Sequence, residues 1–233
     1  GARIDATGSN ISASGVTGSG VFAQQAGSIL NLSNSTVQTD RQNGFGMRAL
    51  GPASISATNG SQVTTLQANS SGVFVDQGGT ATLANSSIAT HGNFSFGIYT
   101  QGGSVTMAST VPVTTVGQNA YGLMLVGTTA GTRLTGTGVT VDTQGANASG
   151  AQMLFGVDMS LTDSSIATHG ANAEAIASYA DAATPNTFVA TRVTLASDAA
   201  TTIDASGGTT IMTLNGVRST SGVNRLLHVG ADV

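Results

Sequence analysis

A repeat of 25 to 26 residues constrains this 233-residue chain more than any other feature of its sequence. Each repeat begins with a glycine that is followed by a short apolar segment, and we call these glycines the anchors. The anchors are Gly20, Gly46, Gly72, Gly97, Gly122 and Gly150, with Ala175 in the seventh place. Successive anchors are 26, 26, 25, 25, 28 and 25 residues apart, which is the spacing of a regular internal repeat.

A threonine two residues after a Val or Ile repeats with the same rhythm and tests the register independently. These threonines are Thr39, Thr65, Thr90, Thr115, Thr143 and Thr168. Their steps are 26, 25, 25, 28 and 25 residues, so a single insertion between Gly127 and Gly138 explains the longer step in both series. The heptapeptide SSIATHG also occurs twice, at 86–92 and 164–170. The repeat is therefore real, and a repeat of this length is typical of a solenoid.

Each repeat contains three short apolar alternations separated by turn residues, as a coil of three strands requires. Residues one and three places after an anchor, such as Val73 and Val75, are expected to face the core. The turns contain glycine or asparagine, which tolerate the left-handed conformation. One set of turn asparagines is Asn43, Asn69, Asn93, Asn119, Asn147 and Asn172. A single coil cannot bury its inner face, so we predict an all-β fold, a right-handed parallel β-helix of about nine coils.

The repeat also predicts how the chain is divided. We expect one β-helix domain over residues 1–233, with regular coils over 15–178. An excursion loop is expected near 179–191, around Pro185, and less regular coils over 192–233.

The composition excludes some classes of partner. Only 8% of the residues are charged, the net charge is −4, and the seven arginines are scattered, so nothing indicates a nucleic-acid surface. No apolar run approaches the roughly 20 residues that cross a bilayer, so no membrane span is expected. The first residues, GARIDATGSN, lack the pattern of a signal peptide. We therefore expect a mature segment or an excised piece of a longer protein.

The residues that could carry chemistry are widely separated. His91 and His169 share a register but lie three coils apart, about 14 Å, which is too far to share a metal ion. Asp40 and Asp142 are four coils apart, and Asp163 occupies a turn position that favours a capping role. We therefore predict no catalytic site, no metal and no cofactor.

A more informative register lies two places after each anchor, where alternation points the side chain outwards. We call it the outer row: Phe22, Arg48, Phe74, Tyr99, Met124 and Gln152, with Ala177 in the seventh place. Aromatic, Arg and Met side chains are enriched at contact surfaces, which makes this row the candidate binding site. A loop or a neighbouring part of the protein could equally cover it. A second aromatic series just before the anchors, Phe45, Phe96 and Tyr121, is expected to plug a corner of the core.

The segments GVFVDQGGTATLANSSIATHG, GIYTQGGSVTMAST and GAQMLFGVDMSLTDSSIATHG, in a chain without cysteine, resemble the passenger domains of Gram-negative autotransporters of the pertactin type. The resemblance covers about residues 15 to 215. It implies export through the periplasm, display at the cell surface or secretion, and a role in adhesion or evasion of host defence. It also implies a separate outer-membrane barrel, which these residues do not contain. An Arg-Gly-Asp tripeptide and a serine protease domain are absent from the sequence.

We therefore expect a virulence module without enzymatic activity, an adhesin or host-factor-binding passenger that contacts a host protein or glycan through the outer row. Two alternatives remain open. A polysaccharide-degrading β-helix would require neighbouring carboxylates in a groove. A structural spacer would bind nothing, or its rods would self-associate through the weakly charged surface.

Overall fold

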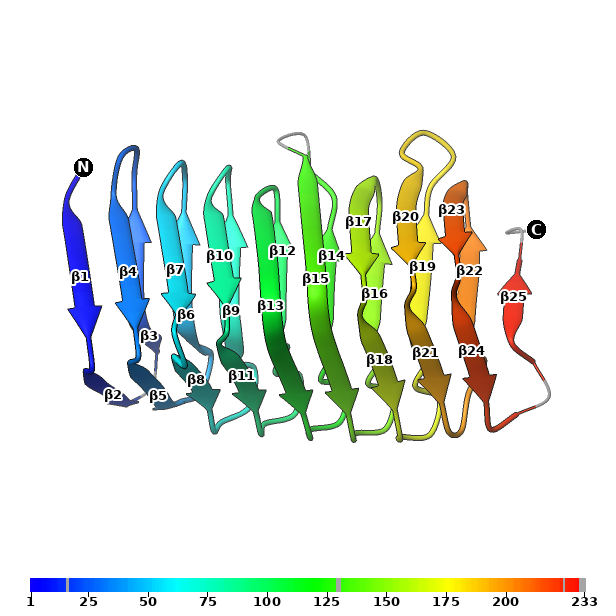
Figure 1. Cartoon of the computed structure of the whole chain (residues 1–233), viewed down its shortest axis with the longest axis horizontal. Coiled ribbons are helices and arrows are strands. Elements are labelled where there is room, and N and C mark those ends of the chain that lie inside the picture. Colours follow the sequence, from blue (N-terminus) through cyan, green and yellow to red (C-terminus); the bar gives the residue numbers. More distant parts are fainter. Residues whose placement is uncertain (16, 129–130, 224, 231–233) are drawn as a thin grey trace.

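The computed structural model describes residues 1–15, 17–128, 131–223 and 225–230. These residues form 25 β-strands and no α-helix. The chain winds as a right-handed parallel β-helix, in which strands run down the near side, return on the far side and advance along the rod with each turn (Figure 1). A nine-stranded sheet forms one side of the rod, so the helix has about nine turns. The predicted fold class is confirmed.

Each coil contributes its first strand to the nine-stranded sheet and its second and third strands to one bent sheet of 16 strands. The first strands are β3 (Gly18–Gln24), β6 (Gly44–Leu50), β9 (Ser71–Asp76), β12 (Ile98–Gln101), β14 (Leu123–Val126), β16 (Ala151–Leu154), β19 (Ile176–Ala180), β22 (Ile203–Gly207) and β25 (Leu227–Val229). The second strands are β1 (Arg3–Thr7), β4 (Ile29–Ser33), β7 (Ser54–Thr58), β10 (Thr80–Ala84), β17 (Val157–Thr162), β20 (Asn186–Thr191) and β23 (Thr210–Asn215). The third strands are β2 (Asn10–Gly15), β5 (Thr36–Arg41), β8 (Gln62–Thr65), β11 (Ser87–Thr90), β18 (Ser165–Thr168), β21 (Thr194–Ser197) and β24 (Arg218–Ser221). In β13 (Ser104–Thr115) and β15 (Thr132–Thr143) the second and third strands are continuous.

The anchors are glycines because the backbone there approaches the third strand too closely for a side chain. A Cβ added at Gly97 would lie 2.3 Å from Cγ1 of Val113 and 2.6 Å from the carbonyl oxygen of Gly122. The other anchor glycines meet a Val or Ile methyl at 2.1 to 2.5 Å in the same way. Ala175 does carry a Cβ, and in its coil Leu195 replaces the usual Val or Ile. Leucine has no branch at Cβ, so its methyl groups lie farther from its own backbone and leave room.

The inner positions are filled as predicted. Side chains one and three places after the anchors, from Val21 to Met153, are buried. The repeated threonines are buried as well, and from Thr65 to Thr168 their hydroxyls close the following turn, whereas Oγ1 of Thr39 has no partner in the described residues. The Oγ1 of Thr65 donates to the carbonyl oxygen of Ser70 at 2.6 Å, and that of Thr90 donates to Ser95 at 2.7 Å. These bonds fix the angle at which each third strand leads into the next coil.

The turn asparagines adopt the left-handed conformation, with one departure from the expected series. Asn43, Asn69, Asn119, Asn147 and Asn172 have φ between 52° and 57°. In the turn between β11 and β12 Phe94 has φ 55° instead, and Asn93 precedes it by one residue. Asp163 has φ 49°, the conformation of the other residues that end the second strands, as its predicted capping role requires.

The strand pairing locates the expected insertion and the expected excursion loop. Gln101 pairs with Val126 and Ser104 with Arg133, so the insertion lies between Val126 and Arg133 and includes residues 129–130, outside the described residues. The excursion expected near 179–191 is shorter than predicted, because β20 already begins at Asn186. Phe188 of β20 is fully buried, and that burial holds the segment in the sheet.

Candidate contact surface

The outer row is a continuous line of side chains across the nine-stranded sheet. Each of its residues pairs with the next, from Phe22 and Arg48 to Gln152 and Ala177. The pairing then extends the row by two residues that the sequence analysis missed, Asp204 on β22 and His228 on β25. The signal for Asp204 was present in the sequence, since Ile203 aligns with Ile176 at the first core position after the anchor.

The aromatic side chains of the row are joined by the second aromatic series. Phe45 stacks on Phe74 with ring centroids 4.7 Å apart, and Phe74 lies 4.8 Å from Tyr99. Phe96 meets Tyr99 edge-on at 5.5 Å and stacks on Tyr121 at 5.4 Å. The prediction that Phe45, Phe96 and Tyr121 plug a corner of the core was therefore wrong.

The physical reason is a break in alternation at the anchor. Gly46 and Met47 both face the core, so Phe45 and Arg48 on either side of them both face outwards. If inward and outward side chains are assumed to alternate without a break through Gly46, Phe45 is assigned to the core side, which is incorrect. The rings form one ladder of five aromatic side chains, Phe45, Phe74, Tyr99, Phe96 and Tyr121, which we call the aromatic ladder.

Arg48 sits at the amino-terminal end of this ladder. Its guanidinium carbon lies 5.1 Å from the ring centroid of Phe22, 5.3 Å from that of Phe45 and 5.4 Å from that of Phe74. These are cation–π distances. Its Nε is buried and has no hydrogen-bond partner within the described part of the chain. Phe22 is 43% exposed, whereas Phe74 is only 7% exposed because the neighbouring rings cover it.

The other end of the same face is acidic. Burial raises the pKa of the Tyr121 and Tyr179 phenols, and the nearby carboxylate of Glu174 raises both further. Asp204 adds to the effect on Tyr179, and its Oδ1 lies 2.8 Å from Nδ1 of His228. The outer row therefore runs from Arg48 among aromatic rings at β6 to Asp204 at β22, with Glu174 just before β19. Asp76 at the end of β9 adds a carboxylate near Tyr99, where it raises the pKa of the phenol beyond the effect of burial.

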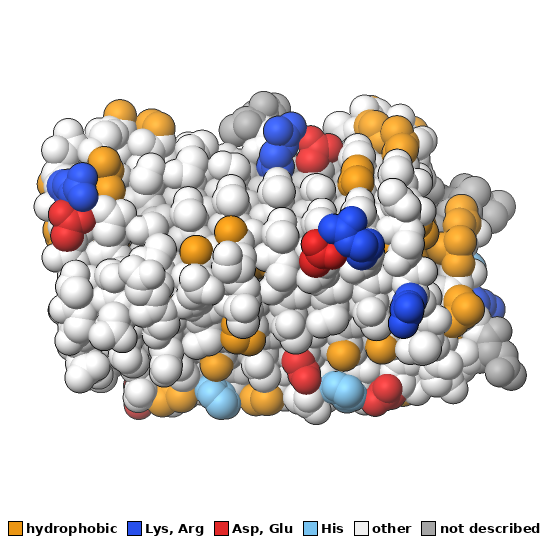
Figure 2. Space-filling model, viewed as in Figure 1, with side chains coloured by type: hydrophobic (Ala, Val, Ile, Leu, Met, Phe, Trp, Pro, Cys, Tyr) orange, Lys and Arg blue, Asp and Glu red, His pale blue; other side chains and the backbone are white. Residues whose placement is uncertain are grey.

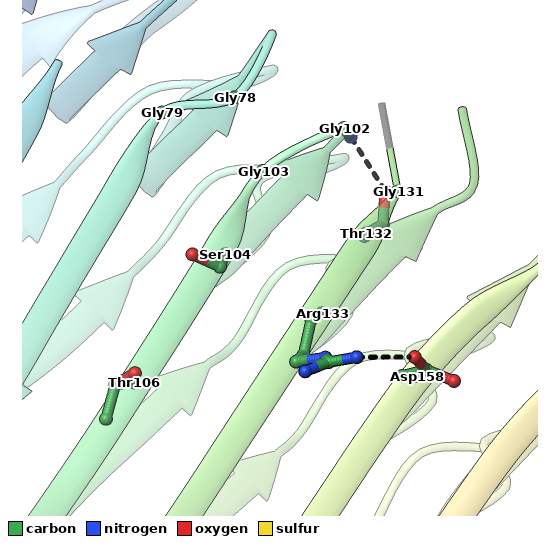
Figure 3. A pocket seen from close by; sticks show the side chains of 10 residues that line it. All are labelled: Gly78, Gly79, Gly102, Gly103, Ser104, Thr106, Gly131, Thr132, Arg133 and Asp158. Atoms are coloured by element: carbon green, nitrogen blue, oxygen red, sulfur yellow. Dashed lines mark hydrogen bonds and ion pairs between the residues drawn. The ribbon is translucent and has the colours of Figure 1, made fainter. Parts of the chain in front are cut away.

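The face formed by the second strands is different in character. It is mostly uncharged, and most of its charged side chains occur as three separate pairs of opposite sign, Arg3 with Asp5, Arg133 with Asp158 and Arg192 with Asp163 (Figure 2). A hollow of about 490 Å³ lies there, where glycines such as Gly79 and Gly103 leave space at the start of β10 and β13. Arg133 reaches from β15 towards Asp158 on β17, with Nη2 and Oδ2 3.2 Å apart (Figure 3). Asp158 is the one carboxylate among the described residues that line this hollow.

The remaining candidate residues lie apart from both surfaces. His91 and His169 are exposed at turns, as expected. The Nδ1 of His169 lies 2.7 Å from Oδ2 of Asp198, and its Nε2 lies 3.7 Å from Oδ1 of Asp142. Asp40 accepts a hydrogen bond from the side chain of Gln67. Over residues 1–15, 17–128, 131–223 and 225–230, no three His, Cys, Asp or Glu side chains are grouped as a metal ion would need.

Comparison of the chain with protein families, with curated protein sequences and with solved structures finds no match. The described residues also contain no helix with the length and apolar character that crossing a bilayer demands.

Proposed function

We propose that this chain is a passenger segment, displayed at the cell surface or secreted, that binds a partner through the outer face of its nine-stranded sheet. The observation that carries the proposal is the aromatic ladder with Arg48 at its end. Aromatic and arginine side chains are the types that dominate binding energy at protein interfaces. The β-helix holds them on rigid strands, so little side-chain freedom remains to be lost on binding.

The ring geometry favours a protein partner over a glycan on this face. Phe45 and Phe74 stack with an interplanar angle of 17°, and Phe96 and Tyr121 with one of 12°. Stacked rings turn their faces towards each other and leave their edges outwards. A sugar ring stacks on a free aromatic face, whereas protein side chains pack well against ring edges and phenol groups. The proposed role is therefore adhesion to, or capture of, a host protein.

The test is capture of partners from host serum and host-cell membrane extract on the immobilised chain. The variant Phe22→Ser/Tyr99→Ser removes exposed aromatic surface without touching the inner row, and circular dichroism checks that its β-structure is retained. The matched control is Thr82→Ala/Thr137→Ala on the exposed face of β10 and β15. The proposal requires a partner that binds the parent and the control but not the aromatic variant. Equal capture by all three chains, or no capture by any, contradicts it.

The hollow beside Arg133 favours a second candidate function, saccharide binding. A carboxylate and a guanidinium 3.2 Å apart, beside the hydroxyls of Ser104 and Thr106, suit the hydroxyl groups of a sugar. A glycan-array measurement with Asp158→Asn tests this site, and retained glycan binding by that variant contradicts it. The degradative alternative needs a second carboxylate near Asp158. The degradative alternative predicts that the parent protein cleaves a polysaccharide and that the Asp158→Asn variant does not.

A further inference from the structure

We propose that the partner of the outer face includes a second copy of this chain, bound face to face and antiparallel, with the two-fold axis passing close to Met124. The inference rests on the proposed function, because it takes the outer row to be a contact surface. It specifies the partner and the orientation.

The arrangement of the row carries the inference. Nine strands contribute one residue each, and Met124 on β14 is the fifth of them. Arg48 on β6 lies three strands before Met124, and Asp204 on β22 lies three strands after it. A two-fold axis that lies between the two faces above Met124 and runs parallel to the strands therefore places Arg48 of each copy opposite Asp204 of the other.

The chemistry of the facing residues is complementary along the row. The guanidinium of Arg48 lies among three aromatic rings and has no carboxylate within salt-bridge distance in the described residues, and the carboxylate of Asp204 is the group that such a cation pairs with. The same two-fold axis places Gln152 opposite Tyr99, whose phenol oxygen donates to Oε1 of Gln101 and can still accept a hydrogen bond from an amide group. Glu174 adds negative charge at the same acidic end. A parallel face-to-face pair would instead set Arg48 against Arg48, which costs energy.

The size of the face fits a stable pair. Nine strands at about 4.8 Å spacing span about 43 Å, and strands of four to seven residues are about 15 to 20 Å long. The face therefore offers about 700 Å² per copy, close to the roughly 800 Å² per partner of standard interfaces. An isologous contact of this kind closes on itself and gives a dimer.

The experiment is sedimentation velocity over a range of concentrations with charge-reversed variants. Arg48→Glu alone and Asp204→Arg alone each set like charges against each other twice in the dimer. Each variant should therefore dimerise at least tenfold more weakly than the parent. An equimolar mixture of the two variants restores both opposite-charge contacts and should dimerise like the parent. Arg218→Glu, on β24 of the other sheet, should leave the dimerisation constant unchanged.

A spin-label measurement tests the orientation, because the chain has no cysteine of its own. Labels at Met124→Cys should lie close together across the axis, and labels at Gln24→Cys should be about 40 Å apart, eight strand spacings. A monomeric parent at all concentrations, or a mixture that does not recover association, overturns the inference. In that case capture of a host protein by the parent would still support the proposed function. A dimer that recovers in the mixture but captures no host protein would support the inference and leave the host-binding role without support.

Discussion

The two sides of the nine-stranded sheet carry opposite kinds of pattern on the same backbone. The inner side repeats one chemistry, with a buried apolar residue at the first core position of each coil, from Val21 to Ile203. The outer row, shifted by one residue, changes from phenylalanine through arginine and methionine to aspartate. Packing in the core allows little variation in volume from coil to coil, whereas the solvent side imposes no such limit. Core packing thus leaves the chemistry of the outer side free to vary, and this makes it the side to search for function.

The strongest test of the inner side is Gly97→Val. The new side chain would begin 2.3 Å from Cγ1 of Val113, so two strands must separate or the backbone must shift. We expect a loss of about 3 kcal/mol or more in the free energy of unfolding, measured by denaturant titration. A loss below about 1 kcal/mol would show that the anchors are not limited by space.

The natural exception at Ala175 supplies a rescue experiment. Gly150→Ala places a Cβ 2.1 Å from Cγ2 of Ile166 and should destabilise the chain strongly. Adding Ile166→Leu reproduces the pair found at Ala175 and Leu195, and should recover part of that loss. If the changes in the free energy of unfolding caused by the two substitutions were simply additive, the steric contact between residues 150 and 166 would not explain the glycine.

The next largest effect is expected for Thr90→Val. This change keeps the shape of the side chain but removes the bond from Oγ1 to the carbonyl oxygen of Ser95, which is 2.7 Å long and buried. The expected loss is about 1 to 3 kcal/mol, because the carbonyl oxygen stays buried without its partner. Thr106→Val, on the exposed face of β13, is the matched control and should change the stability by less than about 0.5 kcal/mol. Equal effects at the two positions would remove the distinction between the inner and outer sides.

The outer side should affect stability less and more locally. Phe74→Ala removes a ring that lies 4.7 Å from that of Phe45 and 4.8 Å from that of Tyr99, and should cost about 2 kcal/mol. Met124→Ala removes a half-buried side chain and should cost under about 1 kcal/mol. Thermal unfolding of the two variants measures the difference. The reverse order would mean that the aromatic ladder does not help to hold the coils together.

The smallest effect is expected at the surface pair of Asp163 and Arg192. Hydrogen bonds from Nε and Nη2 of Arg192, 2.6 and 2.7 Å long, lower the pKa of the Asp163 carboxyl. A carboxyl with a lowered pKa in the folded state stabilises the fold above its unfolded pKa of about 3.9, and this contribution is lost as the pH falls through the folded pKa. Arg192→Gln should raise the pKa of Asp163 towards its ordinary value in an NMR titration. An unchanged titration would show that the pair does not persist in solution.

The sequence by itself determined the parallel β-helix, its number of coils, the inward positions and the outer row. The anchors and the repeated threonines have the same period. Because similar coils are stacked, each coil repeats the same apolar and turn positions, and the repetition makes the pattern unambiguous. Only the tertiary structure decided three other features. It placed Phe45, Phe96 and Tyr121 outside, because each anchor interrupts the strand alternation. It shortened the excursion after β19, because Phe188 gains burial in the next coil. It brought Glu174, Asp204 and His228 to one end of the outer face, since pairing between coils joins residues that are distant along the chain.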